Sequence, residues 1–404
     1  MAKLLPTTRA QVSGHQFMRR RMEHGLVFGD IRMIHDPLAA RRRAAVFGCA
    51  AVAMIAGVMG LFAWMRPDAD PGDAPIVRAA DGTLYVRVGE AAHPVTNLAS
   101  ARLIAGQAAD PARIGDEKLA ELPRGVPVGI VAAPGMFAPE DAPSASWSVC
   151  GADAITVVAG KAPEPLPIDA AVLAADTTRE WVVTAEGRRL LPEAHTPQGR
   201  VIRRALGITP DTPRWTPPTQ VISALRELPP AALPDPLPQI IDADDQAWAL
   251  ADGRIQPITG TQRTMLLDAG AKAAVASRAS LAAYPDAEEE LRLPRERPRW
   301  VEPHLACVDQ NRGGATVDEV PEGIELSGTS VATHFAGLDG GSVGVDSGHG
   351  FHVVSANGLR HRAPDAETLA TVGAAHVEDV PWEIVALLPE GAELSRDAAM
   401  TATY

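Results

Sequence analysis

The chain has 404 residues, which is long enough for one large domain or for two or three ordinary domains with buried cores. Its 35 prolines, 35 glycines and 4% aromatic residues predict many short elements joined by turns instead of long helices. The formal charge of −13 is uneven: the first 43 residues carry nine basic and three acidic side chains, and the acidic remainder excludes nucleic acid as its partner.

Residues 1–43 are predicted to form a basic helical arm. Thr8-Arg9-Ala10-Gln11 has the form of a capping box, the reciprocal hydrogen-bonding pattern of a helix start. A basic amphipathic helix beside a membrane either lies on anionic lipid or docks on a partner protein, and the residues leave both alternatives open. Apolar residues at helical spacing give the candidate docking residues Phe17, Met22, Val27, Ile31, Ile34 and Leu38, with Met18 beside the first two.

Residues 44–65 form a run of 22 residues without a charged side chain and are predicted to be a transmembrane helix. Such a helix spans roughly 33 Å, enough for the hydrocarbon core of a bilayer. A buried core helix would show a polar face, and a cleaved signal peptide would not follow a 43-residue arm. Because basic residues abut the N-terminal end, residues 1–43 are placed in the cytosol and residues 66–404 outside. The predicted membrane anchors are Arg41, Arg42, Arg43 and Trp64.

Residues 66–75 are expected to be a linker, followed by an extracytoplasmic domain over residues 76–404. Four windows in this domain share a strand, a turn at a glycine, a second strand and a helix ending at glycine. Units this small must pack on one another or on a shared core. The windows cover about 76–109, 178–209, 244–275 and 350–375, with turn glycines Gly89, Gly187, Gly253 and Gly358. A helix closed by Leu-Pro follows three of them, at 118–125, 221–230 and 383–391.

The spacing of the turn glycines predicts two halves related by a pseudo-two-fold axis. Successive glycines are 98, 66 and 105 residues apart, a long, short, long pattern. Cys150 lies 61 residues after the first glycine and Cys307 lies 54 after the third, so the two cysteines hold similar places in the two halves. We therefore predict a disulfide between them in an oxidising compartment, with coincidence of spacing as the alternative. Cys49 falls in the membrane run and is interpreted as a small apolar residue.

Several segments resemble the EccB family, a membrane component of type VII (ESX) secretion systems. The arm and the first window are the most specific parts of the likeness, which runs from the N-terminus to near residue 397. The residues that carry it are TTRAQVSGHQFMRRRMEHGLVFGDIRMIHDPLAARRR, TLYVRVGEAAHPVTNLASARLIAG, VISALRELPP, GLRHRAPDAETLATVG and VPWEIVALLPEGAEL.

The resemblance implies a fold, a location and partners. The expected fold is α+β, a single-pass membrane protein whose four repeats surround a central β-rich domain built mainly from residues 126–177 and 276–349. The expected location is the inner membrane of actinobacteria, in a core complex with EccC, EccD and EccE, with a protein partner for the arm and a homo-oligomer formed through the extracytoplasmic domain. One departure is that this domain has shorter loops and a shorter C-terminal tail than the resemblance implies.

Three motifs raise catalytic or metal-binding alternatives. The segment SGTSVATHFAG at 327–337 is similar to the serine segment of a subtilisin-type protease, but the aspartate and histidine segments that should precede Ser330 are missing. Gly160-Lys161 is followed by alanine, and the loop at 339–344 lacks a lysine, so neither has the form of a phosphate-binding loop. His304 with Cys307, and His349 with His352, supply too few ligands for a closed metal site.

The sequence therefore predicts no catalytic or metal-ligating residues. The favoured function is a structural, non-catalytic scaffold that forms or gates a secretion channel. The alternatives are an extracytoplasmic ATPase, for which ATP enters by resemblance alone, and a cell-wall-binding module.

Overall fold

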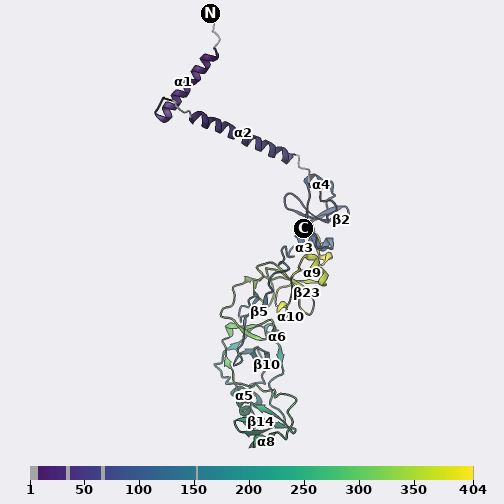
Figure 1. Cartoon of the computed structure of the whole chain (residues 1–404). Helices are drawn as coiled ribbons and strands as arrows, with labels where there is room; N and C mark the ends of the chain where they lie inside the picture. The colour runs from purple at the N-terminus through teal and green to yellow at the C-terminus, as the bar shows by residue number, and fades with distance from the viewer. Residues whose placement is uncertain (1–7, 33–36, 65–68, 152, 404) are drawn as a thin grey trace. The chain divides into compact units, whose positions relative to one another are not determined.

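The computed structural model describes residues 8–32, 37–64, 69–151 and 153–403. The chain divides into two compact units, an N-terminal unit (Met1–Ala69) and a C-terminal unit (Asp70–Tyr404). Several elements of both are labelled in Figure 1. The N-terminal unit is helical and the C-terminal unit mixes short helices with many strands, so the predicted α+β class is confirmed.

The N-terminal unit contains α1 (Arg9–Phe28) and α2 (Pro37–Trp64). α1 begins with the predicted capping box: the Gln11 amide donates to the Thr8 hydroxyl (3.4 Å) and the Thr8 amide donates to Gln11 Oε1 (2.9 Å). It ends at Gly29, which has a left-handed backbone (φ 69°) and whose amide donates to the Gly25 carbonyl at 2.9 Å. Glycine adopts this conformation at little cost, so the helix stops here.

α2 holds the apolar run predicted to cross a membrane. Within its 28 residues, Arg43–Phe62 is long and apolar enough for a membrane span, with a mean hydropathy of 2.3. The helix starts at Pro37, earlier than the predicted 44–65 run, because proline is favoured in a first turn and the intervening alanines and arginines are good helix formers.

Four segments of the C-terminal unit share one order of elements: three antiparallel strands, a helix and a short fourth strand. These segments are called the first, second, third and fourth units, in chain order. The fourth strand pairs in parallel with the first, so each sheet runs third, second, first, fourth. The first two units are β1 (Ile76–Arg78), β2 (Leu84–Val88), β3 (Ala91–Val95), α3 (Leu98–Ala105), β4 (Ala112–Arg113); and β8 (Ala170–Ala175), β9 (Glu180–Thr184), β10 (Gly187–Leu190), α5 (Pro197–Ala205), β11 (Arg214–Trp215). The other two are β13 (Gln239–Ala243), β14 (Gln246–Ala251), β15 (Arg254–Ile258), α7 (Gly260–Asp268), β16 (Ala273–Val275); and β22 (Val343–Asp346), β23 (Phe351–Val354), β24 (Arg360–Ala363), α9 (Ala366–Val372), β25 (Val377–Asp379).

The predicted windows are therefore too short. The last three omit the first strand of their units, and only the third reaches the fourth strand. β8 shows why: all six of its residues are buried, so it lacks the alternation of apolar and polar residues by which a half-exposed strand is recognised.

Each unit is completed by a closing segment, a short second helix followed by residues that pair in parallel with the third strand. The pairs are Ala92 with Arg124, Arg188 with Glu227, Ile255 with Asp286 and Arg360 with Glu390. The helices are α4 (Asp116–Glu121), α6 (Thr219–Ala224), α8 (Arg278–Leu281) and α10 (Trp382–Val385). The sequence predicted three of these segments and missed the one with α8. Proline directly follows the C-cap only in α4; α6 and α10 end four or more residues before theirs, so proline does not terminate them.

A central sheet has seven strands. They come from two stretches of sequence, one between the first and second units and one between the third and fourth units. Its order is β20-β21-β6-β5-β18-β19-β7, with β5 and β18 antiparallel at the middle. All its strands fall within the two stretches predicted to build a central domain: β5 (Ser146–Cys150), β6 (Thr156–Gly160), β7 (Glu164–Pro165), β18 (Ala306–Val308), β19 (Gly314–Thr316), β20 (Ile324–Glu325) and β21 (His334–Gly337). The remaining short elements are β12 (Glu227–Leu228), β17 (Arg299–Trp300), a 3-10 turn (Pro303–Leu305) and α11 (Arg396–Ala399).

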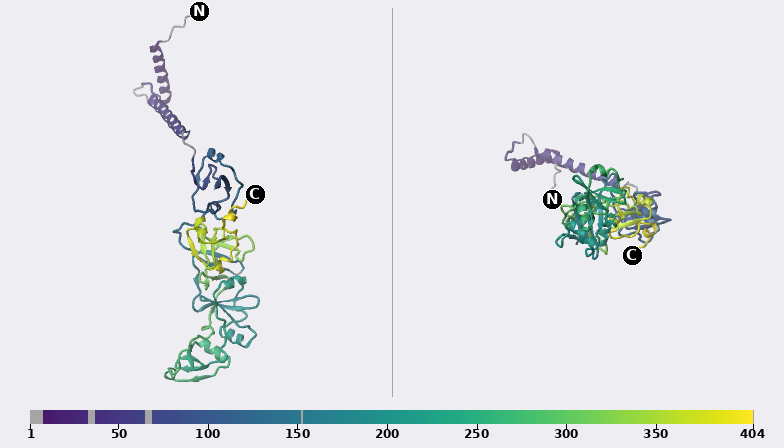
Figure 2. Two further views of the ribbon diagram at one scale, coloured as in Figure 1. Left: turned by 90° about the vertical axis from the view of Figure 1, so that its right-hand side faces the viewer. Right: turned by 90° about the horizontal axis from the view of Figure 1, so that it is seen from below.

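The units pack in pairs that are distant in sequence. α3 of the first unit contacts α9 and α11, and the first and fourth units share one apolar core. α5 of the second unit contacts α7, and the second and third units share another. In Figure 2 the yellow C-terminal segments accordingly lie against the dark blue first unit. A third core joins the central sheet to the second and fourth units, with α6 and α10 in contact there.

Candidate functional site

The arm presents an apolar face to solvent. Met18, Met22 and Leu26 follow one another at intervals of four on α1, and their exposed fractions are 54%, 61% and 86%. Side chains four apart lie on one face of a helix. Phe17 is also exposed (52%) but lies five positions from Met22, away from that face. The sequence prediction missed Leu26, although its spacing from Met18 and Met22 carried the signal.

The predicted stripe of Val27, Ile31, Ile34 and Leu38 is wrong at its first step. α1 ends at Phe28, so Val27 and Ile31 lie on opposite sides of the Gly29 turn. The chain then folds back: His24 Nδ1 lies 2.8 Å from the Asp30 carbonyl oxygen, and Ile31 Cγ2 lies only 2.8 Å from the position a Gly25 Cβ would take. Val27 and Ile31 remain exposed as separate side chains. Ile34 and the side chain of Leu38 lie outside the described residues.

The predicted membrane anchors flank the apolar run of α2. Arg41 and Arg43 are exposed at its N-terminal end, and Trp64 is 83% exposed at the other end. The side chain of Arg42 lies outside the described residues. Cys49 is an exposed free cysteine within the run.

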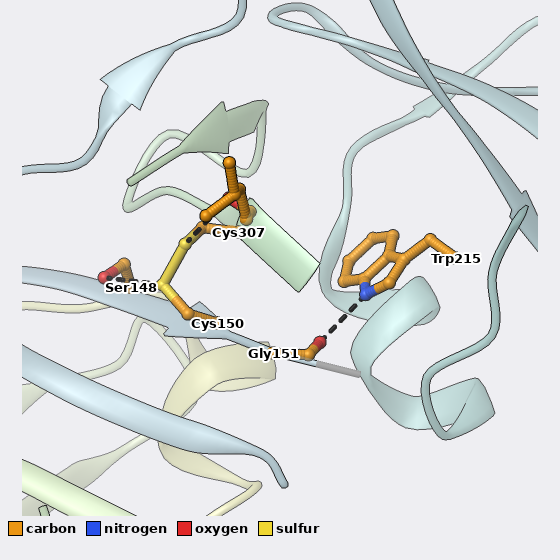
Figure 3. The surroundings of a disulfide bond; sticks show 6 residues. Ser148, Cys150, Gly151, Trp215 and Cys307 are labelled. Atoms are coloured by element: carbon orange, nitrogen blue, oxygen red, sulfur yellow. Dashed lines mark hydrogen bonds between the residues drawn. A yellow bond between two sulfur atoms is a disulfide. The ribbon is translucent and has the colours of Figure 1, made fainter. Parts of the chain in front are cut away.

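The predicted disulfide between Cys150 and Cys307 is confirmed, and it lies at the middle of the central sheet (Figure 3). The two residues are directly opposite each other on β5 and β18, with their Cα atoms 4.1 Å apart. The neighbouring Gly151 amide donates to the Ala306 carbonyl (3.2 Å), so the cysteines occupy a non-hydrogen-bonded position. Opposite Cα atoms approach most closely at such positions.

Next to the disulfide, Trp215 ties the second unit to the central sheet. Its indole Nε1 donates to the Gly151 carbonyl at 2.8 Å, and its side chain is fully buried (Figure 3). Trp215 belongs to β11, the short fourth strand of the second unit. A buried indole N–H needs an acceptor, and the chain turn after Cys150 supplies it.

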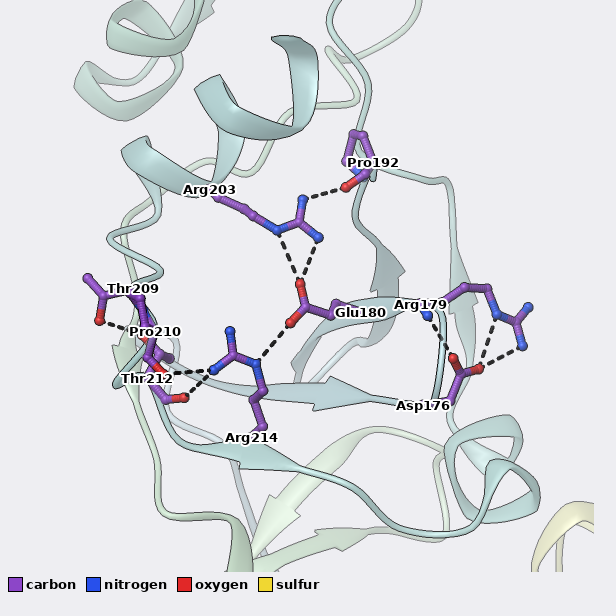
Figure 4. A network of polar contacts seen from close by, with 9 residues as sticks. All are labelled: Asp176, Arg179, Glu180, Pro192, Arg203, Thr209, Pro210, Thr212 and Arg214. Carbon is purple, nitrogen blue, oxygen red and sulfur yellow. Dashed lines mark hydrogen bonds and ion pairs between the residues drawn. The ribbon is translucent and has the colours of Figure 1, made fainter. Parts of the chain in front are cut away.

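Glu180 fixes the position of β11 within the second unit (Figure 4). Its carboxylate on β9 accepts from Arg203 of α5 (2.8 and 3.1 Å) and from Arg214 of β11 (3.0 Å). Burial alone would raise the pKa of the Glu180 carboxyl, but the hydrogen bonds from the two arginines outweigh it and hold that pKa below its usual value. The carboxylate therefore stays ionised and joins the helix and both strands.

In the turn before β9, the Thr178 amide donates to the Asp176 carboxylate (2.8 Å) and Arg179 adds further hydrogen bonds. These contacts lower the pKa of Asp176 to about 2, with the Thr178 bond as the largest cause. The turn that leads to Glu180 is therefore itself held by charge-assisted hydrogen bonds.

Glu378 ties the fourth unit to the central sheet. This buried carboxylate on β25 accepts from the Trp147 indole (2.5 Å) and the Ala145 amide (2.7 Å), both at the start of β5. His376 Nε2 lies 3.1 Å from Oε1, the oxygen that also accepts from the Ala145 amide. Both carboxylate oxygens therefore have hydrogen-bond partners, which a buried carboxylate requires.

The motifs with catalytic or metal-binding alternatives have structural surroundings. The Ser330 hydroxyl donates to the Ala332 carbonyl at 2.8 Å, and His334 Nδ1 lies 2.9 Å from the Thr333 hydroxyl. Cys307 is in the disulfide, and His352 stacks on Trp382. Within the described ranges, no group of three or more His, Cys, Asp or Glu side chains is placed to hold a metal ion.

Comparisons with known proteins extend over most of the chain. A family described as "Type VII secretion system ESX-1, transport TM domain B" matches residues 4–240 and 284–403. The ESX-1 secretion system ATPase EccB1 of Mycobacterium tuberculosis is 30% identical, over 98% of this chain and 94% of that protein. The ESX-3 secretion system ATPase EccB3 of Mycolicibacterium smegmatis is 28% identical, over 98% of this chain and 90% of its own length.

Solved structures give the same result. A chain in the structure of an intact ESX-5 inner membrane complex is similar with a TM-score of 0.66 and 25% identity, covering 100% of this chain and 97% of that one. A chain in the structure of an EccB3 dimer from an ESX-3 core complex has the same fold, with a TM-score of 0.66 and 23% identity over 81% of this chain and 100% of the other.

Proposed function

Because the chain belongs to the EccB family of type VII secretion proteins, we propose that it is a structural core component of an ESX secretion complex in the inner membrane, where it forms or gates the export channel. The observation that carries this proposal is the likeness along its full length to a chain of an intact ESX-5 inner membrane complex. An anchored scaffold needs a membrane span, a partner-binding arm and a rigid outer body, and the chain has a candidate for each.

The proposed topology has the arm in the cytosol and the C-terminal unit in the periplasm. Arg41 and Arg43 at the N-terminal end of the apolar run support this orientation by the positive-inside rule. The disulfide supports it independently, because disulfides persist on the oxidising side of a membrane.

The proposed partners are EccC, EccD, EccE and further copies of this chain. One of the similar solved structures is that of an EccB3 dimer, and this supports a homo-oligomer formed through the C-terminal unit. The bilayer is the remaining partner, contacted by α2.

We infer that the four units are repeats arranged in two halves about a pseudo-two-fold axis at the disulfide. The shared strand order supports the first point, as does a matched detail: His93 and His361 each contact a carbonyl next to a glycine of the closing segment. The central position of β5 and β18, and the contact between α6 and α10, support the axis. Pairing first with fourth and second with third is what such an axis would produce.

For the arm, we propose docking on a protein subunit through the face of Met18, Met22 and Leu26. Replacing Met22 and Leu26 together by aspartate is expected to reduce recovery of the other membrane subunits with this chain by about tenfold or more, since two buried apolar anchors become charged. The measurement is affinity purification from detergent-solubilised membranes, with the amount of this chain in the membrane fraction as the reference.

The matched control is Ser13→Asp with Gln16→Asp, which adds the same charge to exposed, polar positions of α1. It should leave the complex intact. Full recovery of the subunits with the Met22→Asp and Leu26→Asp variant would contradict docking on a protein. It would favour the lipid alternative, in which this variant binds lipid vesicles more weakly than the wild-type chain.

The alternative function is an extracytoplasmic ATPase, favoured by the names of the related proteins. We expect the purified full chain in nanodiscs to hydrolyse ATP no faster than a heat-treated control. In this structure Gly160 ends β6 and Lys161 follows it exposed, while the amides of Gly341 and Ser342 donate to the carbonyls of Leu338 and Met136. Turnover that co-elutes with the chain would overturn the scaffold proposal; retention on peptidoglycan without turnover would favour a cell-wall-binding module.

A further inference from the structure

The closing segment of the fourth unit, residues 382–392, is fastened to β24 by backbone hydrogen bonds and by a histidine at each end. The Arg360 amide donates to the Pro389 carbonyl and the Gly391 amide donates to the Arg360 carbonyl, both at 2.9 Å. His352 contacts the beginning of the segment at Trp382, and His361 contacts its end at Ala392. Both histidine residues are at most 5% exposed.

At the first end, the Trp382 ring contacts two side chains, His352 and Arg360. The ring centroids of His352 and Trp382 are 5.3 Å apart, and the Arg360 guanidinium lies 4.9 Å from the centre of the Trp382 ring. The charged groups facing His352 are Arg360 and Arg362 on β24 and Glu390 on the closing segment. His352 Nδ1 has no hydrogen-bond partner, and neither has Arg360 Nε. Burial, reinforced by the two arginines, lowers the pKa of His352.

At the other end, His361 is fully buried against the backbone. Its Nδ1 lies 2.8 Å from the Ala392 carbonyl oxygen and so donates to it, while Nε2 has no partner. A Cβ on Gly391 would lie 2.4 Å from the ring, so only glycine lets the segment approach this closely. The groups facing the ring are the carbonyls of Ala392 and Ala132, and burial lowers the pKa of His361 despite them.

We propose that the fourth closing segment is an acid-sensitive latch: protonation of His352 and His361 releases residues 382–392 from β24. A charged His352 would face two arginines, and a charged His361 would be fully buried with only the two backbone carbonyls facing it. Release would also loosen α10, whose Ile384 and Val385 belong to the core shared with the central sheet.

The direction of the pH effect follows from linkage. An opened segment returns both rings to water, where the ordinary imidazole pKa is 6.5. Above that value both states are neutral and the latch has its full stability. As the pH falls below 6.5 the open state takes up protons first, so closure weakens until the pH reaches the lower pKa values of the closed state. Each pKa unit by which the closed-state value lies below the open-state value weakens closure at low pH by about tenfold per histidine.

The chain contains its own control. In the first unit, His93 Nδ1 lies 3.0 Å from the Val126 carbonyl oxygen, beside Gly125 of the closing segment. This is the same arrangement as His361 with Ala392 and Gly391, but the His93 ring is partly exposed. Because water already reaches this ring in the closed arrangement, the first closing segment is the reference that should not respond to acid.

The test is amide hydrogen exchange of the full chain in nanodiscs at about pH 7.5 and about pH 5, with labelling times scaled for the intrinsic rate. We expect protection of residues 382–392 to fall by about tenfold or more at the lower pH, while residues 116–126 are unchanged. The variant His352→Phe with His361→Asn keeps the stack and the donor but cannot titrate, so it should lose the response. His195→Asn with His349→Gln changes two exposed histidines and should keep it.

Equal protection at both pH values in the wild-type chain, or an undiminished acid response in the His352→Phe and His361→Asn variant, would overturn the latch. If that variant fails to fold, exchange of the imidazole C2 hydrogens in the wild-type chain decides the matter. The latch requires titration midpoints below 6.5 for His352 and His361, and midpoints at or above that value would reject it. None of these outcomes depends on the role in secretion.

Discussion

Replacing Cys150 and Cys307 together by alanine is expected to lower the free energy of unfolding by about 4 to 5 kcal/mol, because the bond closes a loop of 157 residues. Without it the unfolded chain gains the freedom that this loop removes. The measurement is urea unfolding of the full chain followed by fluorescence of the buried Trp147 and Trp215, which lie close to the bond. The midpoint should move to a lower urea concentration.

Reduction of the wild-type chain should reproduce this shift, and the same treatment should leave the double-alanine variant unchanged. Cys49→Ala is the matched control, because Cys49 is a free cysteine in α2, in the other compact unit. An unchanged midpoint in the double-alanine variant would mean that the bond does not stabilise the protein by restricting the unfolded chain.

Glu378→Ala is expected to lower the free energy of unfolding by about 3 to 5 kcal/mol, because it removes the acceptor of a buried hydrogen-bond network. The Trp147 indole, the Ala145 amide and His376 would all lose their common partner. Glu378→Gln keeps one acceptor oxygen and should cost less. Urea unfolding measures both, and hydrogen exchange of residues 145–150 and 377–379 shows whether the loss is at this junction.

The control for this prediction is Glu227→Ala. Glu227 pairs with Arg188 at 3.4 Å but its side chain is 74% exposed, so its removal should cost less than about 1 kcal/mol. Equal effects at Glu378 and Glu227 would show that burial does not set the strength of the Glu378 network.

Local signals in the sequence predicted the elements that are stabilised locally. The capping box at Thr8 and the uncharged run of α2 depend on neighbours within a few residues, and both are confirmed. The disulfide could be predicted because only two of the three cysteines lie outside the apolar run of α2, which allows one pairing. The predicted stripe that begins at Val27 is wrong because it extends the helical spacing of apolar residues past Gly29. Glycine commonly ends helices, and α1 ends there.

Features that depend on distant residues could not be predicted. β8 is recognisable as a strand only once both of its covered faces are known, and α8 has just four residues and no leucine-proline pair. Glu378 meets Trp147 across 231 residues of chain, and nothing in either local sequence indicates the other. The pairing of the first unit with the fourth belongs to the same class.

Because the first unit packs on the fourth, the first unit cannot complete its packing until the fourth has been synthesised. The Arg102 guanidinium of α3 donates to the Val372 carbonyl, 270 residues later, and residues near the C-terminus pair with the segment around Val128. At roughly 5 to 20 residues per second, the ribosome needs on the order of 15 to 50 seconds to make that interval. Throughout it the part of α3 that packs on α9 and α11 has no partner, so the nascent chain must be shielded from aggregation until the fourth unit and α11 have been made.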